Sequence, residues 1–215
     1  MHDHDAWFKY PEHRIWFNKL WLAEQLKYDC GPCGVSPTRS GEYVVRPIYN
    51  LSGMGVGSSV KFIQEFDATQ VPPGYFWCEK FQGSQYSVTY KFHHDVNPYW
   101  EPISSYCGVK CDADLSKFSH WCKSSYTPKV PRIFNELSDV EVINIEFIED
   151  KPIEVHLRTS PDPDYDVLIP IWRGEDYLVD KYEKLGYTYI KSFEDADGFL
   201  STPRLGFMVK ENDNG

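Results

Sequence analysis

The stretch "EYVVRPIYNLSGMGVGSS", residues Glu42–Ser59, joins a β-type run to a glycine-rich loop. The run reaches an Arg-Pro step at Arg46, and three glycines then follow at alternate positions: Gly53, Gly55 and Gly57. Glycine lets backbone N–H groups approach an anion closely, and a guanidinium adds a rigid positive fork. The loop lacks the Gly-Lys-Ser/Thr ending of a P-loop and does not match the G-x-G-x-x-G fingerprint. It predicts an anion-binding loop, with an ordinary turn as the alternative.

Length and charge narrow the class of protein. The 215 residues are enough for one domain or two small lobes with a real core. The net charge of -10, from 22 basic and 32 acidic residues, argues against a sequence-independent grip on nucleic acid, which needs a basic surface. No apolar run approaches the ~20 residues that span a bilayer, and the N-terminus does not resemble a secretory signal. We therefore expect no membrane partner and a cytoplasmic location.

Periodicity predicts the order of elements in the first half of the chain. Residues 13–28 fit an amphipathic helix, and the Gly- and Pro-rich residues 29–41 fit a turn region. After the strand at 42–49 we expect a strand or short helix at 60–66. Strands at 70–81 and 83–92 would then be joined antiparallel at the bend Gly83-Ser84, with a loop following at 93–112.

The second half of the chain carries clearer signals. Two alternating runs, 140–148 and 152–158, are separated by Glu-Asp-Lys and predict a hairpin. Residues 174–187 predict a helix that ends at Gly186, and a strand pair near 188–192 and 205–210 would close the chain before a disordered tail. Hairpins without regular βαβ units indicate an α+β fold.

Three segments in order resemble the ATP-grasp superfamily over residues 14–160. They are "VVRPIYNLSGMGVGS", "CEKFQGSQYSV" and "IEFIEDKPIEVHLR". The family has a strand ending in a cation and proline before a glycine-rich loop, a hinge of the form "EEFIxGxEFSV", and a carboxylate hairpin similar to "DFxxxxxxxxIEVN". The sequence is most similar to short, arginine-containing phage and bacterial members. The resemblance implies two small lobes, 1–76 and 77–215, that clasp a nucleotide without a separate N-terminal substrate domain.

The resemblance also implies a role for each matching residue. Arg46 stands in place of a phosphate-contacting lysine, and Lys19 is the second cation. Arg158 would hold an acyl phosphate or a substrate carboxylate. Gln85 takes the place of the ribose-binding glutamate. The remaining nucleotide contacts come from two segments: the loop residues Ser52, Gly53, Met54, Gly55 and Gly57, and the hinge residues Cys78, Glu79, Lys80 and Phe81.

The carboxylate hairpin is the implied metal site. Glu146 and Glu154 match the two carboxylates that bridge Mg²⁺, and His156 stands where the family has an asparagine. Strand alternation independently places Glu154, His156 and Arg158 on one face, with Glu146 across from them. The alternative is a solvent-exposed polar face, with Ile153 and its alternate neighbours packing inward.

The function implied is an ATP- and Mg²⁺-dependent ligase that joins a carboxylate to an amine through an acyl phosphate. Its substrates would be small molecules or peptides, and a protein partner could supply the acceptor site. The alternative is a non-catalytic nucleotide- or partner-binding protein, such as a virion component.

Cysteine and histidine clusters give further alternatives. A zinc site would use Cys107, Cys111, His120 and Cys122, with Cys30 and Cys33 as a second half-site. The tetrapeptide "CGPC" also resembles a thioredoxin-type motif. "HDHD" at 2–5 is interpreted as a frayed terminus, "HHD" at 93–95 as a polar loop, and 158–166 as a rigid exposed loop. Arg204, in an expected terminal hairpin at 195–207, is a further candidate substrate contact.

Overall fold

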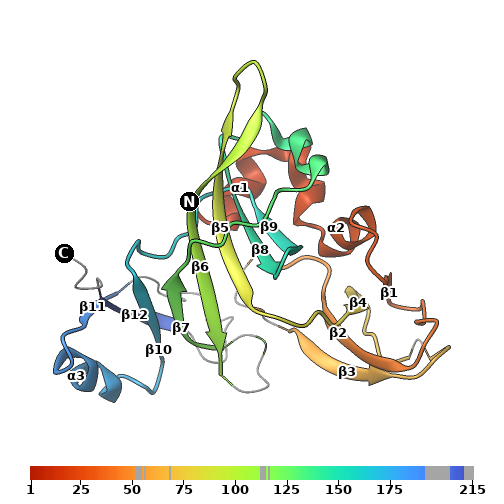
Figure 1. Ribbon diagram of the computed structural model, residues 1–215. Coiled ribbons are helices and arrows are strands. Elements are labelled where there is room, and N and C mark those ends of the chain that lie inside the picture. The colour runs from red at the N-terminus through yellow and green to blue at the C-terminus, as the bar shows by residue number, and fades with distance from the viewer. Residues whose placement is uncertain are drawn as a thin grey trace.

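Figure 1 shows the computed structural model, which describes residues 1–51, 55, 57–67, 69–111, 115, 117–191 and 204–210. The helices are α1 (Asp3–Lys9), the 3-10 helix η1 (Pro11–Phe17), α2 (Lys19–Gln25), the 3-10 helix η2 (Arg132–Leu137) and α3 (Tyr177–Glu183). The strands are β1 (Cys30–Pro32), β2 (Gly41–Pro47), β3 (Ser59–Ile63), β4 (Tyr75–Glu79), β5 (Gln85–His93), β6 (Tyr99–Lys110), β7 (Phe118–Lys123), β8 (Val142–Ile148), β9 (Lys151–His156), β10 (Val167–Trp172), β11 (Thr188–Ile190) and β12 (Arg204–Lys210).

The strands form two antiparallel sheets. The smaller sheet has the order β1-β4-β2-β3, and the larger sheet has the order β11-β12-β10-β7-β6-β5-β8-β9. Figure 1 shows the smaller sheet to the right, while the larger sheet extends across the centre to the strands beside α3. The α+β fold class predicted from the sequence is confirmed. The boundary expected between residues 76 and 77 falls inside β4, and the change of sheet comes between β4 and β5.

The largest core lies on one face of the larger sheet. Apolar side chains of β5 and β8 pack there against the first two dozen residues and η2; they include Ala6, Trp16, Leu22, Val88, Tyr90, Phe134, Ile143, Ile145 and Phe147. The N-terminal helices therefore pack on the sheet built from later residues. Because side chains alternate along a strand, Asn144, Glu146 and Ile148 face the opposite side from this core. That opposite face carries the site described below.

The N-terminal part of the chain differs from the sequence prediction at two places. Residues 13–28 do not form one helix, because Asn18 has extended backbone angles and its side chain accepts a hydrogen bond from the Trp21 N–H at 2.9 Å, which starts α2 anew. Residues 2–5 are not frayed: α1 begins at Asp3, whose side chain is buried. Both differences arise from local capping or tertiary contacts rather than from hydrophobic periodicity.

Several strands also differ from the prediction. The expected loop at 93–112 contains β6, a twelve-residue strand paired with both β5 and β7, and β1, β7 and β10 were not predicted. Pro102 obscures the pattern of β6; it lies beside a register shift, where its missing N–H is tolerated. The ambiguous segment 60–66 holds the strand β3.

Gly83 and Ser84 do not join an antiparallel pair. β4 pairs with β1 and β2, whereas β5 pairs with β6 and β8, so this step carries the chain from one sheet to the other. Gly83 has φ +120°, a conformation that residues with a side chain rarely adopt. The hairpin of β8 and β9, the helix α3 with Gly186 at φ +82° after it, and the pairing of β11 with β12 agree with the prediction.

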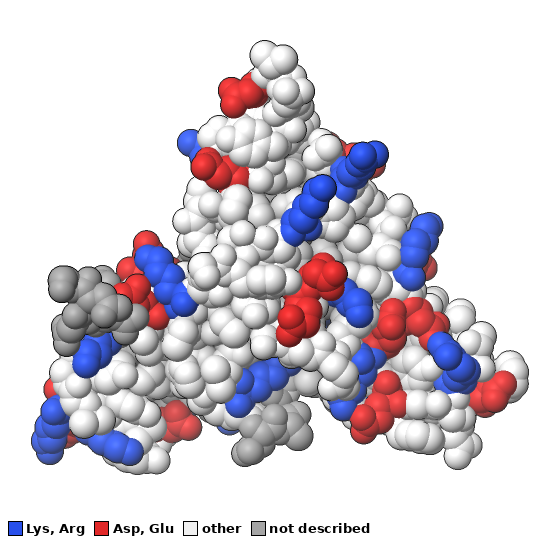
Figure 2. Space-filling view, viewed as in Figure 1, with Lys and Arg blue, Asp and Glu red and all other residues white. Residues whose placement is uncertain are grey.

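Charges of both signs are interleaved on the face shown in Figure 2, and neither sign forms a continuous patch there. No helix within the described residues is long and apolar enough to cross a membrane.

Candidate functional site

A cavity of about 750 Å³ is lined by residues of both sheets and of the N-terminal segment. β2 and β4 of the smaller sheet contribute Val44, Arg46, Cys78 and Glu79, while the floor comes from the larger sheet. The walls include residues from both ends of the chain, such as Asp3, Lys19 and Arg204. The site therefore depends on contacts between segments that are far apart in the sequence.

The floor of the cavity follows rows of residues that are directly opposite one another on neighbouring strands. One row runs from β8 to β10 through Ile148, Gln85, Gly108, Trp121 and Leu168. A second row runs from β9 to β6 through Glu154, Glu146, Ser87 and Tyr106. All of these residues except Gly108 line the cavity. The β8 and β9 end of the floor is polar, and the β6, β7 and β10 end is aromatic and apolar.

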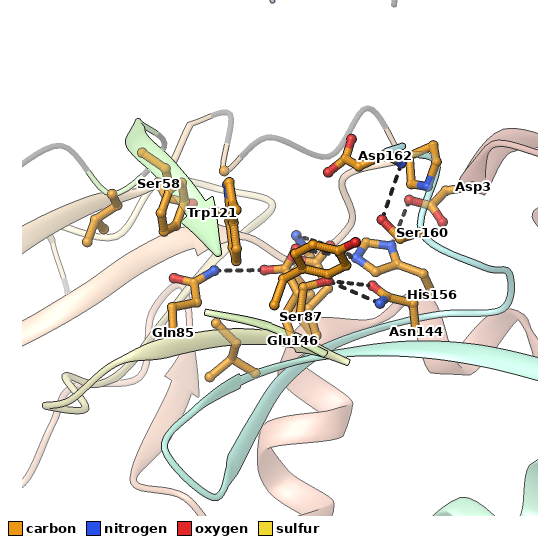
Figure 3. Close-up of a pocket in the computed structure, with 18 of the residues that line it drawn as sticks. Asp3, Ser58, Gln85, Ser87, Trp121, Asn144, Glu146, His156, Ser160 and Asp162 are labelled. Atoms are coloured by element: carbon orange, nitrogen blue, oxygen red, sulfur yellow. Dashed lines mark hydrogen bonds and ion pairs between the residues drawn. The ribbon is translucent and has the colours of Figure 1, made fainter. Parts of the chain in front are cut away.

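Polar side chains at the β8 and β9 end are held by specific bonds. Lys19 Nζ lies 2.8 Å from Glu154 Oε1, and both side chains are largely buried. Gln85 Nε2 donates to Glu146 Oε2 at 3.0 Å, as Figure 3 shows. Arg46 Nη2 donates to the Ile153 carbonyl at 2.9 Å. Two cations and two carboxylates thus converge on one end of the cavity.

Burial and charge act in opposite directions on Glu154. Burial alone raises the pKa of its carboxyl, but the positive charges of Lys19, His156 and Arg46 outweigh burial and leave the pKa below its usual value. Glu154 is therefore an ionised carboxylate at neutral pH. An ionised carboxylate beside two fixed cations suits the binding of a polyanion together with a metal ion.

A buried ion cluster formed by Asp3, His156 and Arg158 stands next to these carboxylates. Asp3 Oδ2 lies 2.8 Å from His156 Nδ1 and 2.9 Å from Arg158 Nη2, and Arg158 Nε lies 2.8 Å from Asp3 Oδ1. The exposed fractions of Asp3, His156 and Arg158 are 3%, 4% and 8%. This finding overturns the alternative of a solvent-exposed hairpin face; the grouping of Glu154, His156 and Arg158 opposite Glu146 is confirmed. Ile153, expected to pack inward in that alternative, lines the cavity because a register shift interrupts the pairing beside it.

The cluster also sets the charge of His156. Burial lowers the pKa of the imidazole, but the carboxylate of Asp3 more than offsets this and raises the pKa to about 10. His156 Nε2 lies 3.7 Å from Glu146 Oε1 and 3.9 Å from Glu154 Oε1, and Figure 3 shows Glu146 between Gln85 and His156. A protonated imidazole cannot ligate a metal. Here His156 acts as a cation beside the carboxylates.

The cavity brings together most of the residues that the sequence singled out. Those that line it are Lys19, Arg46, Gly55, Cys78, Glu79, Phe81, Gln85, Glu146, Glu154, His156 and Arg158. Gly57 and Lys80 are not among the lining residues, and Lys80 Nζ pairs with Glu42 at 2.7 Å. Ser52, Gly53 and Met54 lie outside the described residues, as do 192–203 and the tail 211–215.

The bidentate face of Arg158 is already occupied. Two of its nitrogens contact Asp3, and Nη1 donates to the Thr159 carbonyl at 3.0 Å. A guanidinium engaged in this way cannot also grip a substrate carboxylate through the same fork. Arg158 thus holds Asp3 in this structure, and its role in substrate binding stays a prediction.

The predicted cysteine and histidine sites were a zinc site, a redox motif and a polar loop. Among the described residues, Glu12, His13 and Asp139 form the only group of three or more His, Cys, Asp or Glu side chains whose ligand atoms lie within 4.8 Å of one another, so Cys107, Cys111, His120 and Cys122 do not form the predicted zinc site. In "CGPC", Cys30 begins β1, and burial raises the pKa of its thiol to about 11, opposite to the lowered pKa of a redox-active thiol. His93 ends β5 and pairs with Glu101 at 2.6 Å, so the "HHD" segment is only partly loop.

Sequence reasoning missed several residues of the cavity. Asp3 and Asn144 contribute to the polar end, and Tyr106, Lys110 and Trp121 to the aromatic end. The segment "YWEPISSYCGVK" forms β6, but Pro102 within it is typical of a loop, and its cysteine indicated a metal site instead of a strand. Asp3 gave no local signal, because its partners lie more than 150 residues away.

No protein-family model and no curated protein matches the chain. Among solved structures, N5-carboxyaminoimidazole synthetase from Staphylococcus aureus, complexed with ADP, matches with 13% identity and a TM-score of 0.56, over 93% of this chain and 69% of that chain. A protein assigned to the ATP-grasp superfamily from Archaeoglobus fulgidus matches with 13% identity and a TM-score of 0.40. An L-amino acid ligase from Bacillus licheniformis matches with 11% identity and a TM-score of 0.44.

These likenesses concern the fold. In the last two matches, the aligned region covers 68% of this chain. It covers only 46% of the Archaeoglobus protein and 41% of the Bacillus ligase. The match to the synthetase covers 93% of this chain. The chain has the ATP-grasp fold, as its three sequence segments indicated.

Proposed function

We propose that this protein is an ATP- and Mg²⁺-dependent ligase that joins a carboxylate to an amine. The observation that carries the proposal is the convergence of Lys19, Arg46, Gln85, Glu146 and Glu154 on one cavity. These residues come from α2, β2, β5, β8 and β9, and the sequence motifs predict each of them as a site residue. The ADP complex of the structurally similar synthetase further supports a nucleotide in this fold.

The nucleotide would lie between the two sheets. Arg46 and Lys19 would hold its β and γ phosphates, with the glycine-rich loop covering them. Cys78, Glu79 and Phe81 line the cavity beside Arg46 and would contact adenine. Phe81 is held in place by Tyr28, with 4.7 Å between ring centroids, and it offers an aromatic surface for a base. Gln85 would bind a ribose hydroxyl.

Glu146 and Glu154 fit a magnesium site. Mg²⁺ prefers oxygen ligands and is commonly held by one or two carboxylates together with substrate phosphates. The two carboxylates lie directly opposite one another on β8 and β9 and face the cavity. The Nδ1 of His156 is taken by Asp3 and its ring is protonated, so it does not fit this set. We propose that Glu146 and Glu154 hold the metal. The protonated ring of His156 adds one positive charge beside these carboxylates and is not a metal ligand.

The side chains of the cavity suggest how the reaction proceeds. Mg²⁺ held by Glu146 and Glu154 would neutralise phosphate charge, which is the main requirement of phosphoryl transfer. Lys19 and Arg46 stabilise the developing negative charge while a substrate carboxylate attacks the γ-phosphate. An amine then displaces phosphate from the acyl phosphate and gives an amide, with ADP and phosphate as the other products. The network from Asp3 to Arg158 keeps His156 fixed beside the carboxylates.

Calorimetric titration with a non-hydrolysable ATP analogue and Mg²⁺ tests the proposal. Wild-type protein should bind the analogue, and Lys19→Met or Glu154→Gln should weaken binding by about tenfold or more, since each removes a charge-assisted contact. Lys80→Met is the matched control, because Lys80 lies close to the same hinge but pairs with Glu42 outside the cavity. Absence of binding by wild-type protein, or equal binding by Glu154→Gln, would refute the nucleotide site.

A non-catalytic binding protein is the second candidate, and one observation favours it. The ion cluster of Asp3, His156 and Arg158 fills positions where a catalytic site would offer free groups. Such a protein would bind the nucleotide without turning it over. Formation of ADP in the presence of a panel of carboxylates and hydroxylamine, which traps acyl phosphates as hydroxamates, distinguishes the two candidates.

Three finer expectations remain proposals. The arginine at position 46 suggests a place among the short phage and bacterial members of the superfamily. A cytoplasmic location is consistent with an ATP-dependent activity. A protein partner could contribute to the acceptor site.

A further inference from the structure

The cavity extends well beyond the groups assigned to the nucleotide. At its β6, β7 and β10 end it is lined by the rings of Tyr106, Phe118, Trp121 and Trp172 together with Leu168 and Pro170. Leu168, Pro170 and Trp172 occupy alternate positions on β10, so they share one face. Trp121 and Leu168 are directly opposite one another on β7 and β10. An aromatic surface therefore continues the polar floor within the same cavity.

Gly108 makes this surface possible. It lies between Gln85 and Trp121 in the row that crosses the floor. A Cβ atom at this position would come within 2.7 Å of the ring of Phe118 and 2.8 Å of the ring of Trp121. The two rings, whose centroids are 4.3 Å apart, thus lie over the backbone of β6. The glycine separates the polar end of the floor from the aromatic end and leaves room for the rings.

One cation stands where the two ends meet. Lys110 ends β6, lines the cavity, and is half-buried near the ring of Phe118. Among the described residues it forms no ion pair, whereas Lys19 is paired with Glu154 and Arg158 with Asp3. Lys110 and Glu146 both line the cavity. A half-buried ammonium with no ion pair to any described residue favours an anionic ligand.

The far end of the aromatic surface is closed by an ion pair. Arg204 Nη2 lies 2.7 Å from Asp162 Oδ1, and the guanidinium stacks on Phe207 at 4.3 Å. At this end of the cavity, among the described residues, Arg204 is paired with Asp162 and Lys110 forms no ion pair, so Lys110 is the cation that we expect a carboxylate to contact. The distribution of charge therefore gives a ligand one orientation, with its carboxylate toward Lys110 and its apolar part toward Trp121.

We infer that the aromatic end of this cavity binds the carboxylate substrate, and that this substrate carries an aromatic or similarly flat apolar group. Its carboxylate is held by Lys110 next to the phosphates, and its ring lies against Trp121 and Tyr106. Flat apolar groups gain both burial and offset or edge-on ring contacts on such a surface. The assignment of this ligand as a substrate rests on the proposed function, whereas the binding site itself does not.

Three matched compounds test the inference: 3-phenylpropionate, 3-phenyl-1-propanol and propionate. Each is titrated into the full chain, with and without the ATP analogue and Mg²⁺, and binding is measured by calorimetry and by saturation-transfer NMR. We expect 3-phenylpropionate to bind at least tenfold more tightly than propionate, because propionate has no ring to contact the aromatic surface. The affinity of 3-phenylpropionate should also exceed that of the alcohol, which lacks the negative charge that Lys110 recognises.

Variants separate the two contributions to binding. Trp121→Ala should weaken 3-phenylpropionate about tenfold, and Trp121→Phe should retain most of the affinity if the ring acts as a stacking surface. Lys110→Met should weaken the acid and leave the alcohol unchanged. Lys91→Met, an exposed change on β5, and Tyr177→Ala, an exposed change on α3, serve as controls. Thermal unfolding identifies any variant that fails to fold, in which case Trp121→Phe and the three wild-type titrations decide.

The outcomes distinguish this inference from the proposed function. Saturable binding of 3-phenylpropionate that depends on Trp121 and Lys110 supports the site even if the ATP analogue fails to bind, a result that would overturn the ligase proposal alone. Binding of the analogue with no preference for 3-phenylpropionate over propionate would overturn the inference and leave the proposed function intact. Equal loss of the acid and the alcohol in Lys110→Met would overturn the role of Lys110.

Discussion

Replacing Asp3 by asparagine should destabilise the protein strongly. Asp3 is 3% exposed and contacts His156 and Arg158 at 2.8 to 2.9 Å through both carboxylate oxygens. Asparagine keeps the size of the side chain but removes its charge, which leaves the buried Arg158 guanidinium without its carboxylate partner and removes the charge that keeps His156 protonated. Removing one partner from a buried ion pair costs about 3–5 kcal/mol, and a chain of this size loses about 2–4 °C of Tm per kcal/mol. We therefore expect the Tm to fall by roughly 6–20 °C.

Urea unfolding followed by tryptophan fluorescence, with differential scanning calorimetry, measures this change. Asp5→Asn is the matched control, since Asp5 lies in the same helix but is exposed and accepts only from the His2 backbone N–H. Its loss should cost about 1 kcal/mol or less, as for other helix-capping contacts. If Asp3→Asn unfolds at the same urea concentration as Asp5→Asn, the ion cluster does not hold the N-terminus to β9 and the reasoning fails.

Three further predictions concern pH, thiol reactivity and packing. The pKa of His156 is raised to about 10, so its contribution to stability is complete below about pH 6.5 and is lost as the pH rises toward 10. The pKa of Asp3 is lowered, so its contribution is complete above about pH 3.8 and declines as the pH falls below that value. The difference in urea midpoint between wild type and Asp3→Asn should therefore shrink from pH 7 to pH 9.5, and a constant difference would contradict this. In "CGPC", iodoacetamide at pH 8 should alkylate the exposed Cys33 roughly tenfold faster than Cys30, whose thiol pKa burial raises to about 11; peptide mass spectrometry measures both rates. Phe134→Ala should lower the free energy of unfolding, measured in urea, by about 3–5 kcal/mol, because the ring is fully buried. A decrease under about 1 kcal/mol would show that the surrounding side chains close the space left by the ring.

Local patterns predicted the elements whose signals are contained within a few residues. The hairpin of β8 and β9 shows strict alternation on both sides of a short polar turn, and α3 shows helical spacing followed by Gly186. The order of the loop, the hinge and the hairpin was enough to indicate the fold. The same order pointed to Lys19, Arg46 and Glu154, which the structure places in one cavity.

Elements whose neighbours lie far away in the sequence were the ones misjudged. β6 was taken as a loop, because a strand held by ladders on both sides tolerates Pro102 and a register shift that break its alternation. Gly83 was taken as a hairpin bend, although the strands that it joins belong to separate sheets. No local pattern distinguishes a bend within a sheet from a crossing between sheets, since the difference lies in which strands pair.

The sequence by itself determined the α+β class, the order of the motifs and the residue types suited to phosphate and metal chemistry. Only the tertiary structure decided how those residues are used. It joined Asp3 to His156 and Arg158 across more than 150 residues, so both side chains are engaged in a buried ion cluster that the sequence did not indicate. It also placed Trp121 and Lys110 in the same cavity as Glu146. Charge and burial at a site depend on which distant side chains come within a few ångströms, and that proximity is a property of the folded chain alone.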